Sequence, residues 1–232
     1  MEQENGHRKY IVNGVEYPSV TQVLAVVNKP YLVTWANRMG LQGVNTQYVL
    51  EKAASIGTLT HKMINMDLSA SAEPLDAKLY PFTHWEAAQR AFASFMMWKK
   101  KQGEIKPVRL ESAIASAGLR YGGTLDALVY LNGKLTLIDF KTSASIHKEY
   151  FAQLAAYGML YDNDRHEWSD YVEIEDMIVL RLGKEGAPSY EESHIVDRQS
   201  YESYFFRALD LYYAQKEIAD NVPIVSNVAR TE

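Results

Sequence analysis

Two apolar runs on either side of Asn132-Gly133 are the feature that most constrains how this chain can fold. ALVYL precedes this pair and KLTLI follows it. Asn-Gly favours a two-residue hairpin loop, because both central positions of such a loop require positive φ. Counting outward from the loop places Asp126 opposite Asp139. The sequence therefore predicts a β-hairpin that brings two carboxylates together.

The predicted Asp126/Asp139 pair falls at a non-hydrogen-bonded position, where Cα atoms lie roughly 4.5 Å apart and side chains share one face. Lys141, two residues after Asp139, points to the same face. Adjacent carboxylates repel each other and resist burial, which a divalent cation and a lysine would relieve. The alternative is that both acids are solvated. Apolar residues on both faces of the hairpin favour burial: Leu128, Tyr130, Leu135 and Leu137 beside the acids, and Ala127, Val129, Leu131 and Ile138 opposite.

Composition limits the class of protein. With 232 residues, of which 47% are hydrophobic and 23% charged, the chain suits one compact globular domain. It has no cysteine, which excludes disulfides, cysteine-ligated zinc, an iron–sulfur cluster and thiol catalysis. Its net charge of −5 argues against a protein that coats duplex DNA. No apolar segment is long enough to span a membrane, so we expect no membrane partner and an intracellular, cytoplasmic location.

Residues 1–106 are predicted to be mainly helical, and residues 107–232 to form the core. In the first part we expect a short strand pair at 10–17, followed by helices at 19–27, 35–41, 46–68 and 83–102. In the second we expect strands at 108–115, 119–131 and 134–143, a helix at 147–161, strands at 171–182 and 189–196, and a helix at 198–220. This order predicts an α/β or α+β fold with its sheet covered on both faces.

Two further residues could converge on the predicted acidic pair. Glu111 lies in the middle of the strand VRLES, where its carboxylate could support a metal or face solvent. His61 shares a helical stripe with Gly57, Ile64 and Leu68. A glycine one turn earlier would let this helix approach the sheet closely, and the imidazole could complete a metal site or be a core histidine.

Other candidates concern substrate. Gln153 and Tyr157 share one face of a helix, where they could orient a phosphate or a water, or simply be part of an amphipathic pattern. A basic run, Lys99-Lys100-Lys101, could contact a nucleic-acid backbone or form a solvated helix end. Four aromatic residues are candidates for stacking bases, although aromatics at helical spacing are more often core residues. They are Tyr31, Trp35, Tyr48 and Trp98.

Taken in order along the chain, these motifs resemble the RecB-like branch of the PD-(D/E)XK nuclease superfamily. They are Gly57…His61, Glu111, Gly123…Asp126, Asp139-Phe140-Lys141 and Gln153…Tyr157. The first acid follows leucine rather than proline, a common departure in this branch. The segment YPSVTQVL, which contains Ser19 and Thr21, together with Trp35 and Arg38, further resembles the group of mitochondrial genome-maintenance exonucleases and their phage and bacterial relatives.

The resemblance implies a restriction-endonuclease-like core with a mixed β-sheet flanked by helices, over which the helical N-terminal region arches. It implies that Mg²⁺ or Mn²⁺ is bound by His61, Asp126, Asp139 and the Phe140 backbone carbonyl. Lys141 would position or help to deprotonate the attacking water, with Glu111 and Gln153 also in the catalytic site. Substrate contacts would come from Ser19, Thr21, Trp35, Tyr157 and Lys99 to Lys101.

The implied function is a metal-dependent DNA exonuclease that prefers single-stranded DNA or free ends. It would act in replication, recombination or repair, in the cytoplasm of a bacterium or a phage host. One alternative is a structure-specific or duplex endonuclease. Another is a catalytically silent DNA-binding subunit, against which the intact acid–acid–lysine set argues. The oligomeric state stays open.

Overall fold

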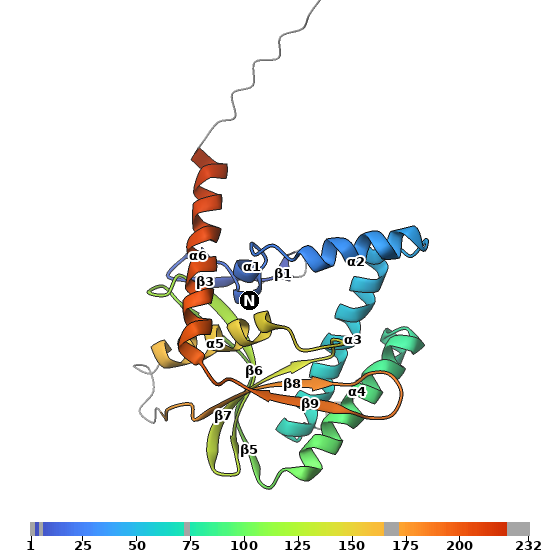
Figure 1. The fold of residues 1–232 in the computed structure, drawn as a ribbon. Coiled ribbons are helices and arrows are strands. Elements are labelled where there is room, and N and C mark those ends of the chain that lie inside the picture. The colour runs from blue at the N-terminus through green and yellow to red at the C-terminus, as the bar shows by residue number, and fades with distance from the viewer. Residues whose placement is uncertain (1–2, 5–6, 72–74, 165–171, 222–232) are drawn as a thin grey trace, which may run out of the picture.

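A five-stranded mixed sheet forms the centre of the computed structural model, which describes residues 3–4, 7–71, 75–164 and 172–221 (Figure 1). Its strands, in spatial order, are β5 (Ile105–Ser116), β6 (Tyr121–Leu131), β7 (Lys134–Lys141), β8 (Asp176–Leu182) and β9 (Tyr190–His194). β7 and β8 run parallel, whereas the other neighbouring strands run antiparallel. The expected mixed sheet flanked by helices is confirmed.

Helices dominate the part of the chain before this sheet, as expected. They are α1 (Val20–Leu24), α2 (Pro30–Leu41), α3 (Thr46–Ser69) and α4 (Phe82–Lys101), with a 3-10 turn at Ala77–Leu79, whereas α5 (Lys148–Asp164) lies between β7 and β8 and α6 (Arg198–Asn221) follows β9. Two short strand pairs precede them: β1 (Gln3–Glu4) with β2 (His7–Arg8), and β3 (Tyr10–Val12) with β4 (Val15–Tyr17). α1 ends three residues earlier than expected. α2 begins five residues earlier, because Pro30 suits the first turn of a helix.

The last helix, α6, extends well beyond the rest of the fold (Figure 1). Its buried residues are Phe205, Ala208 and Leu209, all in its first half. The second half contacts the fold through half-buried Tyr212 and Tyr213 and is otherwise exposed to solvent. Within the described part of the chain, no helix has both the length and the apolar character needed to cross a bilayer.

Each face of the sheet is covered by its own hydrophobic cluster. On one face, Leu128, Leu135 and Leu137 pack with residues of α1, α5 and α6. On the other, Ala127 and Ile138 pack with residues of α3 and α4. The hairpin is covered on both sides, which confirms the expectation from its two apolar faces.

The hairpin turn has the predicted geometry. Asn132 and Gly133 have φ values of 52° and 85°. β6 and β7 pair in the predicted register from Leu131/Lys134 to Ala127/Ile138. The ladder ends there, so the prediction that Asp126 and Asp139 form a ladder pair is wrong. Instead, the backbone N–H of Phe140 donates to Asp126 Oδ2 over 2.9 Å.

An irregularity in β5 lies beside this ladder end. Glu111 has a φ of 45°, which is unusual for a residue with a side chain. The β5/β6 pairing passes from Leu110/Ala127 to Ser112/Leu125 and omits Glu111 and Asp126. Ala127 belongs to the cluster of α3 and α4, whereas Leu125 belongs to the opposite cluster. The alternation of faces is thus interrupted where the two acids lie.

Candidate active site

Three side chains with metal-binding chemistry meet where α3 passes the irregularity of β5. They are His61, Glu111 and Asp126, and one ligand atom of each lies within 4.8 Å of the others. His61 Nδ1 is 3.3 Å from Asp126 Oδ1 and 3.7 Å from Glu111 Oε1. Carboxylate oxygens and an imidazole nitrogen suit a divalent cation such as Mg²⁺ or Mn²⁺. We call these three residues the imidazole–carboxylate cluster. The sequence predicted their convergence, and the structure brings them together.

The other nitrogen of His61 is held by the backbone of β7. Its Nε2–H donates to the Phe140 carbonyl oxygen over 2.9 Å, which fixes the orientation of the ring. Burial lowers the pKa of His61, but the Asp126 carboxylate and the hydrogen bonds outweigh it and raise this pKa to about 10. The metal-free imidazole is therefore protonated at neutral pH. The Phe140 carbonyl, expected to bind metal, here accepts a hydrogen bond from His61.

Asp139 and Lys141 form a buried ion pair next to the imidazole–carboxylate cluster. Lys141 Nζ lies 2.7 Å from Asp139 Oδ2, and the Asp139 side chain is 1% exposed. Burial raises the pKa of Asp139 to about 6, although the Lys141 charge opposes the shift. Apart from Lys141, no described residue donates a hydrogen bond to either carboxylate oxygen of Asp139. Buried carboxylate oxygens in this state favour a further positive ligand, so the residues present fit a divalent cation.

A chain of hydrogen bonds positions the lysine. Lys141 Nζ donates to Gln153 Oε1 over 3.0 Å, and Gln153 Nε2 donates to the Tyr157 hydroxyl over 2.8 Å. Both partners come from α5, one turn apart. Gly123 lets Tyr157 sit directly on β6, because a Cβ at residue 123 would lie 2.5 Å from Tyr157 Cε1. The motif Gly123…Asp126 therefore contacts the motif Gln153…Tyr157 through Tyr157, and Gln153 of the second motif binds Lys141.

Aromatic rings connect the lysine to α2. Lys141 Nζ lies 5.0 Å from the centre of the Tyr150 ring, and Tyr150 contacts His147 edge to face. His147 in turn stacks on Tyr31 of α2, with ring centres 5.6 Å apart. Tyr31 is 46% exposed, so one end of this series of rings is open to solvent. The sequence did not single out His147, which lies in the loop before α5 and has no spacing that marks it.

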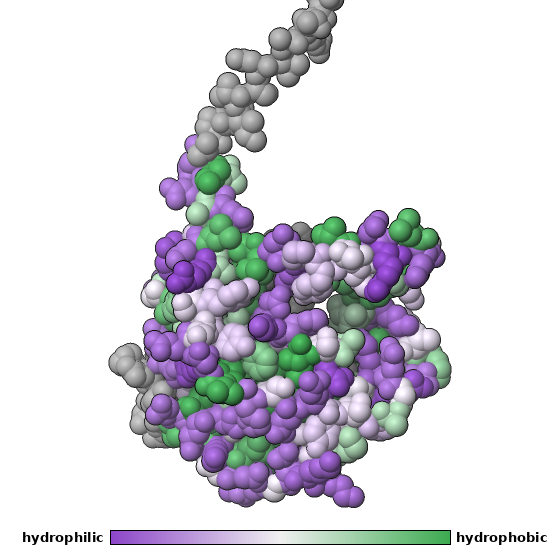
Figure 2. All heavy atoms as spheres, in the orientation of Figure 1, coloured by the Kyte–Doolittle hydropathy of each residue, from purple (hydrophilic) through white to green (hydrophobic). Residues whose placement is uncertain are grey.

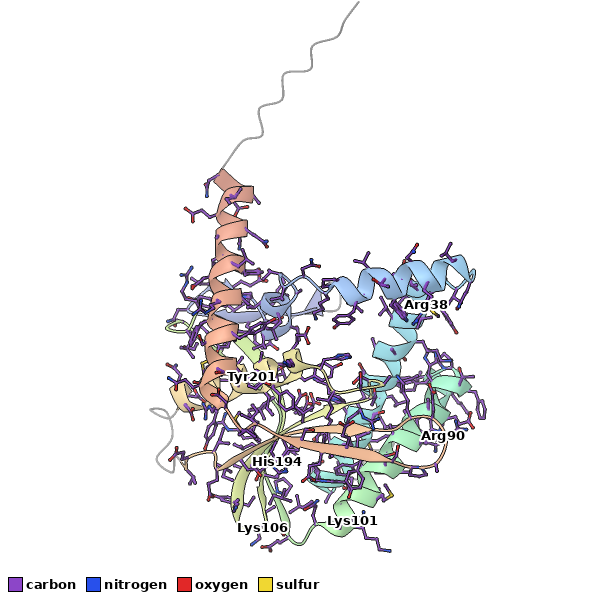
Figure 3. All side chains as sticks on the ribbon, viewed as in Figure 1. Arg38, Arg90, Lys101, Lys106, His194 and Tyr201 are labelled. Atoms are coloured by element: carbon purple, nitrogen blue, oxygen red, sulfur yellow. The ribbon has the colours of Figure 1, made fainter. Side chains whose placement is uncertain are left out.

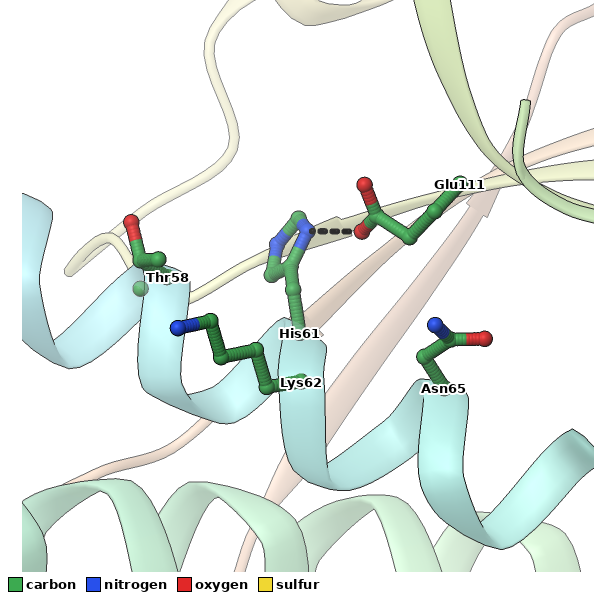
Figure 4. A pocket seen from close by; sticks show the side chains of 6 residues that line it. Thr58, His61, Lys62, Asn65 and Glu111 are labelled. Carbon is green, nitrogen blue, oxygen red and sulfur yellow. Dashed lines mark ion pairs between the residues drawn. The ribbon is translucent and has the colours of Figure 1, made fainter. Parts of the chain in front are cut away.

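A pocket of about 430 Å³ opens on the imidazole–carboxylate cluster (Figure 4). Besides His61 and Glu111, it is lined by Gly57, Thr58, Lys62 and Asn65 of α3. Sequence analysis missed Thr58, Lys62 and Asn65, although their spacing from His61 puts them on neighbouring faces of one helix. The expectation for Gly57 is wrong, because a Cβ there would lie 3.5 Å from Thr142 Oγ1, an ordinary contact.

The basic run at the end of α4 is engaged in local contacts. Lys99 Nζ lies 2.6 Å from Asp67 Oδ2, and Lys101 Nζ lies 5.2 Å from the centre of the Tyr190 ring. Lys100 is exposed. Figure 3 shows Lys101 at the end of α4 that is distant from α2, where Arg38 lies. None of these three lysines lines the pocket at the cluster.

The remaining substrate candidates lie in different surroundings. Trp98 is 1% exposed and its indole N–H donates to Glu192, so the idea that it stacks a base is wrong. Trp35 is half-buried on α2, and Tyr48 is exposed at the start of α3. Ser19 Oγ accepts from the Gln22 backbone N–H and contacts Thr21 Oγ1 at 3.0 Å. Ser19 thus caps α1, and Thr21 lies in the first turn of this helix.

The metal-free protein is expected to lose stability as pH rises. The pKa of His61 is raised from 6.5 to about 10, so its contribution is complete below pH 6.5 and is lost by about pH 10. The pKa of Asp139 is raised from 3.8 to about 6, so stability also increases as pH falls from 6 toward 4. The pKa of Asp126 is lowered, so the stability that this carboxylate contributes is lost only as pH falls below about 4.

Thermal unfolding in chelator at pH 5, 7 and 9 measures this dependence. His61→Gln should reduce the loss of melting temperature between pH 7 and 9, because it removes the titrating imidazole. Since His61 must release a proton before Nδ1 binds a cation, added Mg²⁺ should stabilise wild type more at pH 9 than at pH 7. Equal pH profiles for wild type and variant would contradict the raised pKa.

Comparison with known proteins gives three findings. A sequence profile described as the PD-(D/E)XK nuclease superfamily matches residues 34–223. The chain is 28% identical over 207 residues to mitochondrial genome maintenance exonuclease 1 of Mus musculus. This match covers 83% of the chain and 56% of the mouse protein. A solved structure of a candidate exonuclease from Eubacterium rectale overlays on 77% of each chain, with 14% identity and a TM-score of 0.44. The chain thus spans little more than half the length of its mouse relative.

Proposed function

Because the chain belongs to the PD-(D/E)XK nuclease superfamily, we propose that it is a metal-dependent deoxyribonuclease that degrades single-stranded DNA or DNA from free ends. The observation that carries this proposal is the imidazole–carboxylate cluster beside the Asp139/Lys141 pair. The name of the mouse relative supports an exonuclease rather than another nuclease. A role in replication, recombination or repair, in the cytoplasm of a bacterium or a phage host, belongs to the same proposal.

The residues that would hold Mg²⁺ or Mn²⁺ are His61, Glu111, Asp126 and Asp139. Once the His61 imidazole is neutral, the carboxylates carry more negative charge than the Lys141 ammonium alone balances. A bound divalent cation supplies polarisation of the phosphoryl oxygen and acidifies water for attack. Asp126 is kept in place for this role by the Phe140 N–H, and His61 by the Phe140 carbonyl.

Lys141 would act as a fixed positive charge beside the scissile phosphate. Burial lowers its pKa, but the Asp139 and Asp126 carboxylates outweigh burial and raise this pKa above its ordinary value. The ammonium therefore keeps its proton at neutral pH, which favours stabilisation of developing negative charge over removal of a proton from water. Gln153 and Tyr157 hold the ammonium in position through their hydrogen bonds.

The helical residues 1–106 would arch over the centre formed by residues 107–232, within one compact domain. Figure 2 shows the surface hollowed below α2, on the side where α2 bridges toward α3. Exposed Tyr31 and Tyr48, and half-buried Trp35, lie on these two helices and are candidates for stacking unpaired bases. A strand that enters such a hollow needs little bulk positive charge, which agrees with the net charge of −5.

End-labelled linear single strands, linear duplexes and closed circular single strands, each with Mg²⁺, Mn²⁺ or chelator, test the proposal. We expect stepwise shortening of linear single strands with metal, no cleavage in chelator and intact circles. Cleavage of closed circles would show an endonuclease. Binding without cleavage under every metal condition would overturn the enzymatic proposal in favour of a DNA-binding subunit.

A further inference from the structure

We propose that Thr58, Lys62 and Asn65 form a phosphate-binding strip on α3, which holds the nucleic-acid backbone next to the scissile position. The proposal rests on the proposed nuclease function and extends it from the reacting centre to the path of the strand. These three residues line the pocket that also contains His61 and Glu111 (Figure 4). We call them the α3 strip.

The α3 strip runs along one face of the helix, parallel to its axis. Thr58, Lys62 and Asn65 are four and three residues apart, so their side chains leave the same face of α3. From Thr58 to Asn65 the strip covers about 10 Å along the helix axis. His61 lies between its ends, which places the imidazole–carboxylate cluster beside the middle of the strip. A backbone that follows the strip would therefore pass directly by the cluster.

The chemistry of the α3 strip matches a phosphodiester backbone. A hydroxyl, an ammonium and a carboxamide all donate hydrogen bonds, and none of them carries negative charge. Such a surface is needed here, because Glu111 lines the same pocket and repels phosphates, and the Asp126 carboxylate lies 3.3 Å from His61 Nδ1. Donors of this kind hold a backbone without reading the bases.

Lys62 is available for this contact. Its side chain is exposed, and Nζ donates to the Tyr80 hydroxyl over 3.2 Å and lies 5.9 Å from the centre of that ring. Among the described residues its partners are therefore a neutral hydroxyl and a ring rather than a carboxylate. Lys99, in contrast, is paired with Asp67 at 2.6 Å. An exposed lysine on a neutral partner can turn to a phosphate without breaking an ion pair.

Lys216 offers a matched control for Lys62. Both lysines are exposed on helices, but Lys216 lies on α6 and does not line the pocket. The experiment measures the dissociation constant of a fluorescein-labelled single-stranded oligonucleotide by anisotropy, in chelator and at several salt concentrations. Wild type, Lys62→Met, Lys62→Arg and Lys216→Met are compared, and circular dichroism checks that each variant is folded.

We expect Lys62→Met to weaken binding about tenfold, as for loss of one charge-assisted hydrogen bond. The slope of log affinity against log salt should fall by about 0.7, the value for one phosphate of a single strand. Lys216→Met should change the dissociation constant less than about twofold, and Lys62→Arg should keep the wild-type slope.

Equal effects of Lys62→Met and Lys216→Met on the dissociation constant, or an unchanged salt slope in Lys62→Met, would overturn the proposal of the α3 strip. If wild type cleaves DNA with metal while Lys62→Met binds as tightly as wild type, the strip fails and the nuclease proposal stands. If wild type neither binds nor cleaves any oligonucleotide, both proposals fail.

Discussion

Replacing Lys141 by methionine is expected to reduce the rate of DNA cleavage about 100- to 1,000-fold and to destabilise the fold at the same time. The first effect follows because the ammonium is the fixed positive charge of the site. The second follows because Asp139 would remain buried, 1% exposed, without a hydrogen bond and without its cation. Removing one partner of a buried ion pair typically costs about 3–5 kcal/mol.

Single-turnover cleavage and urea unfolding of the same preparations measure the two effects separately. Lys141→Met/Asp139→Asn serves as the control, because it removes both charges together. We expect this double variant to recover most of the lost stability and none of the activity. The instability of Lys141→Met should shrink at pH 5, where Asp139 takes up a proton. A fully stable Lys141→Met protein at pH 8 would show that Lys141 does not compensate the Asp139 charge.

Replacing Asp126 by asparagine is expected to lower cleavage about 1,000-fold or more and to abolish stabilisation by divalent cations. Asparagine has nearly the same shape, and its carbonyl oxygen can still accept from the Phe140 N–H. The variant should therefore stay folded. It loses the charge nearest to His61 Nδ1, so it loses both a ligand and the main cause of the raised imidazole pKa.

Asp210→Asn is the matched control for this substitution, because Asp210 is an exposed acid on α6. Titration with Mn²⁺ followed by the shift in melting temperature reports binding without any cleavage. Wild type and Asp210→Asn should show the same shift, and Asp126→Asn should show little. A wild-type shift in Asp126→Asn would mean that Asp126 is not a ligand.

Short sequence patterns correctly predicted the turn, the two covered faces and most of the register of the β6/β7 hairpin. Asn132-Gly133 specified its turn because few other residues tolerate positive φ at both positions. The two apolar faces of the hairpin predicted that helices would cover both sides of the sheet, and they do. Regular alternation from the turn also gave the correct register up to Ala127/Ile138.

The same reasoning failed where the backbone departs from regularity. Counting alternate residues along a strand cannot predict the positive φ of Glu111, because glutamate has no preference for that backbone conformation. That irregularity places Glu111 and Asp126 with His61, while Asp139 pairs with Lys141. Charge density along the sequence also does not show which lysine lies at the pocket. Lys99 belongs to the most basic run yet pairs with Asp67, whereas the isolated Lys62 lines the pocket.

The parallel pairing of β7 with β8 has a consequence for the order of folding. β5, β6 and β7 are joined by short turns and pair antiparallel, so they close small loops at low entropic cost. β8 reaches β7 only after residues 142–175, including α5, have crossed over. Asp139 pairs with Val179 of β8, so we expect its carboxylate to be enclosed in this later step. A compensating proton or cation can thus reach Asp139 from solvent before the interior closes around it.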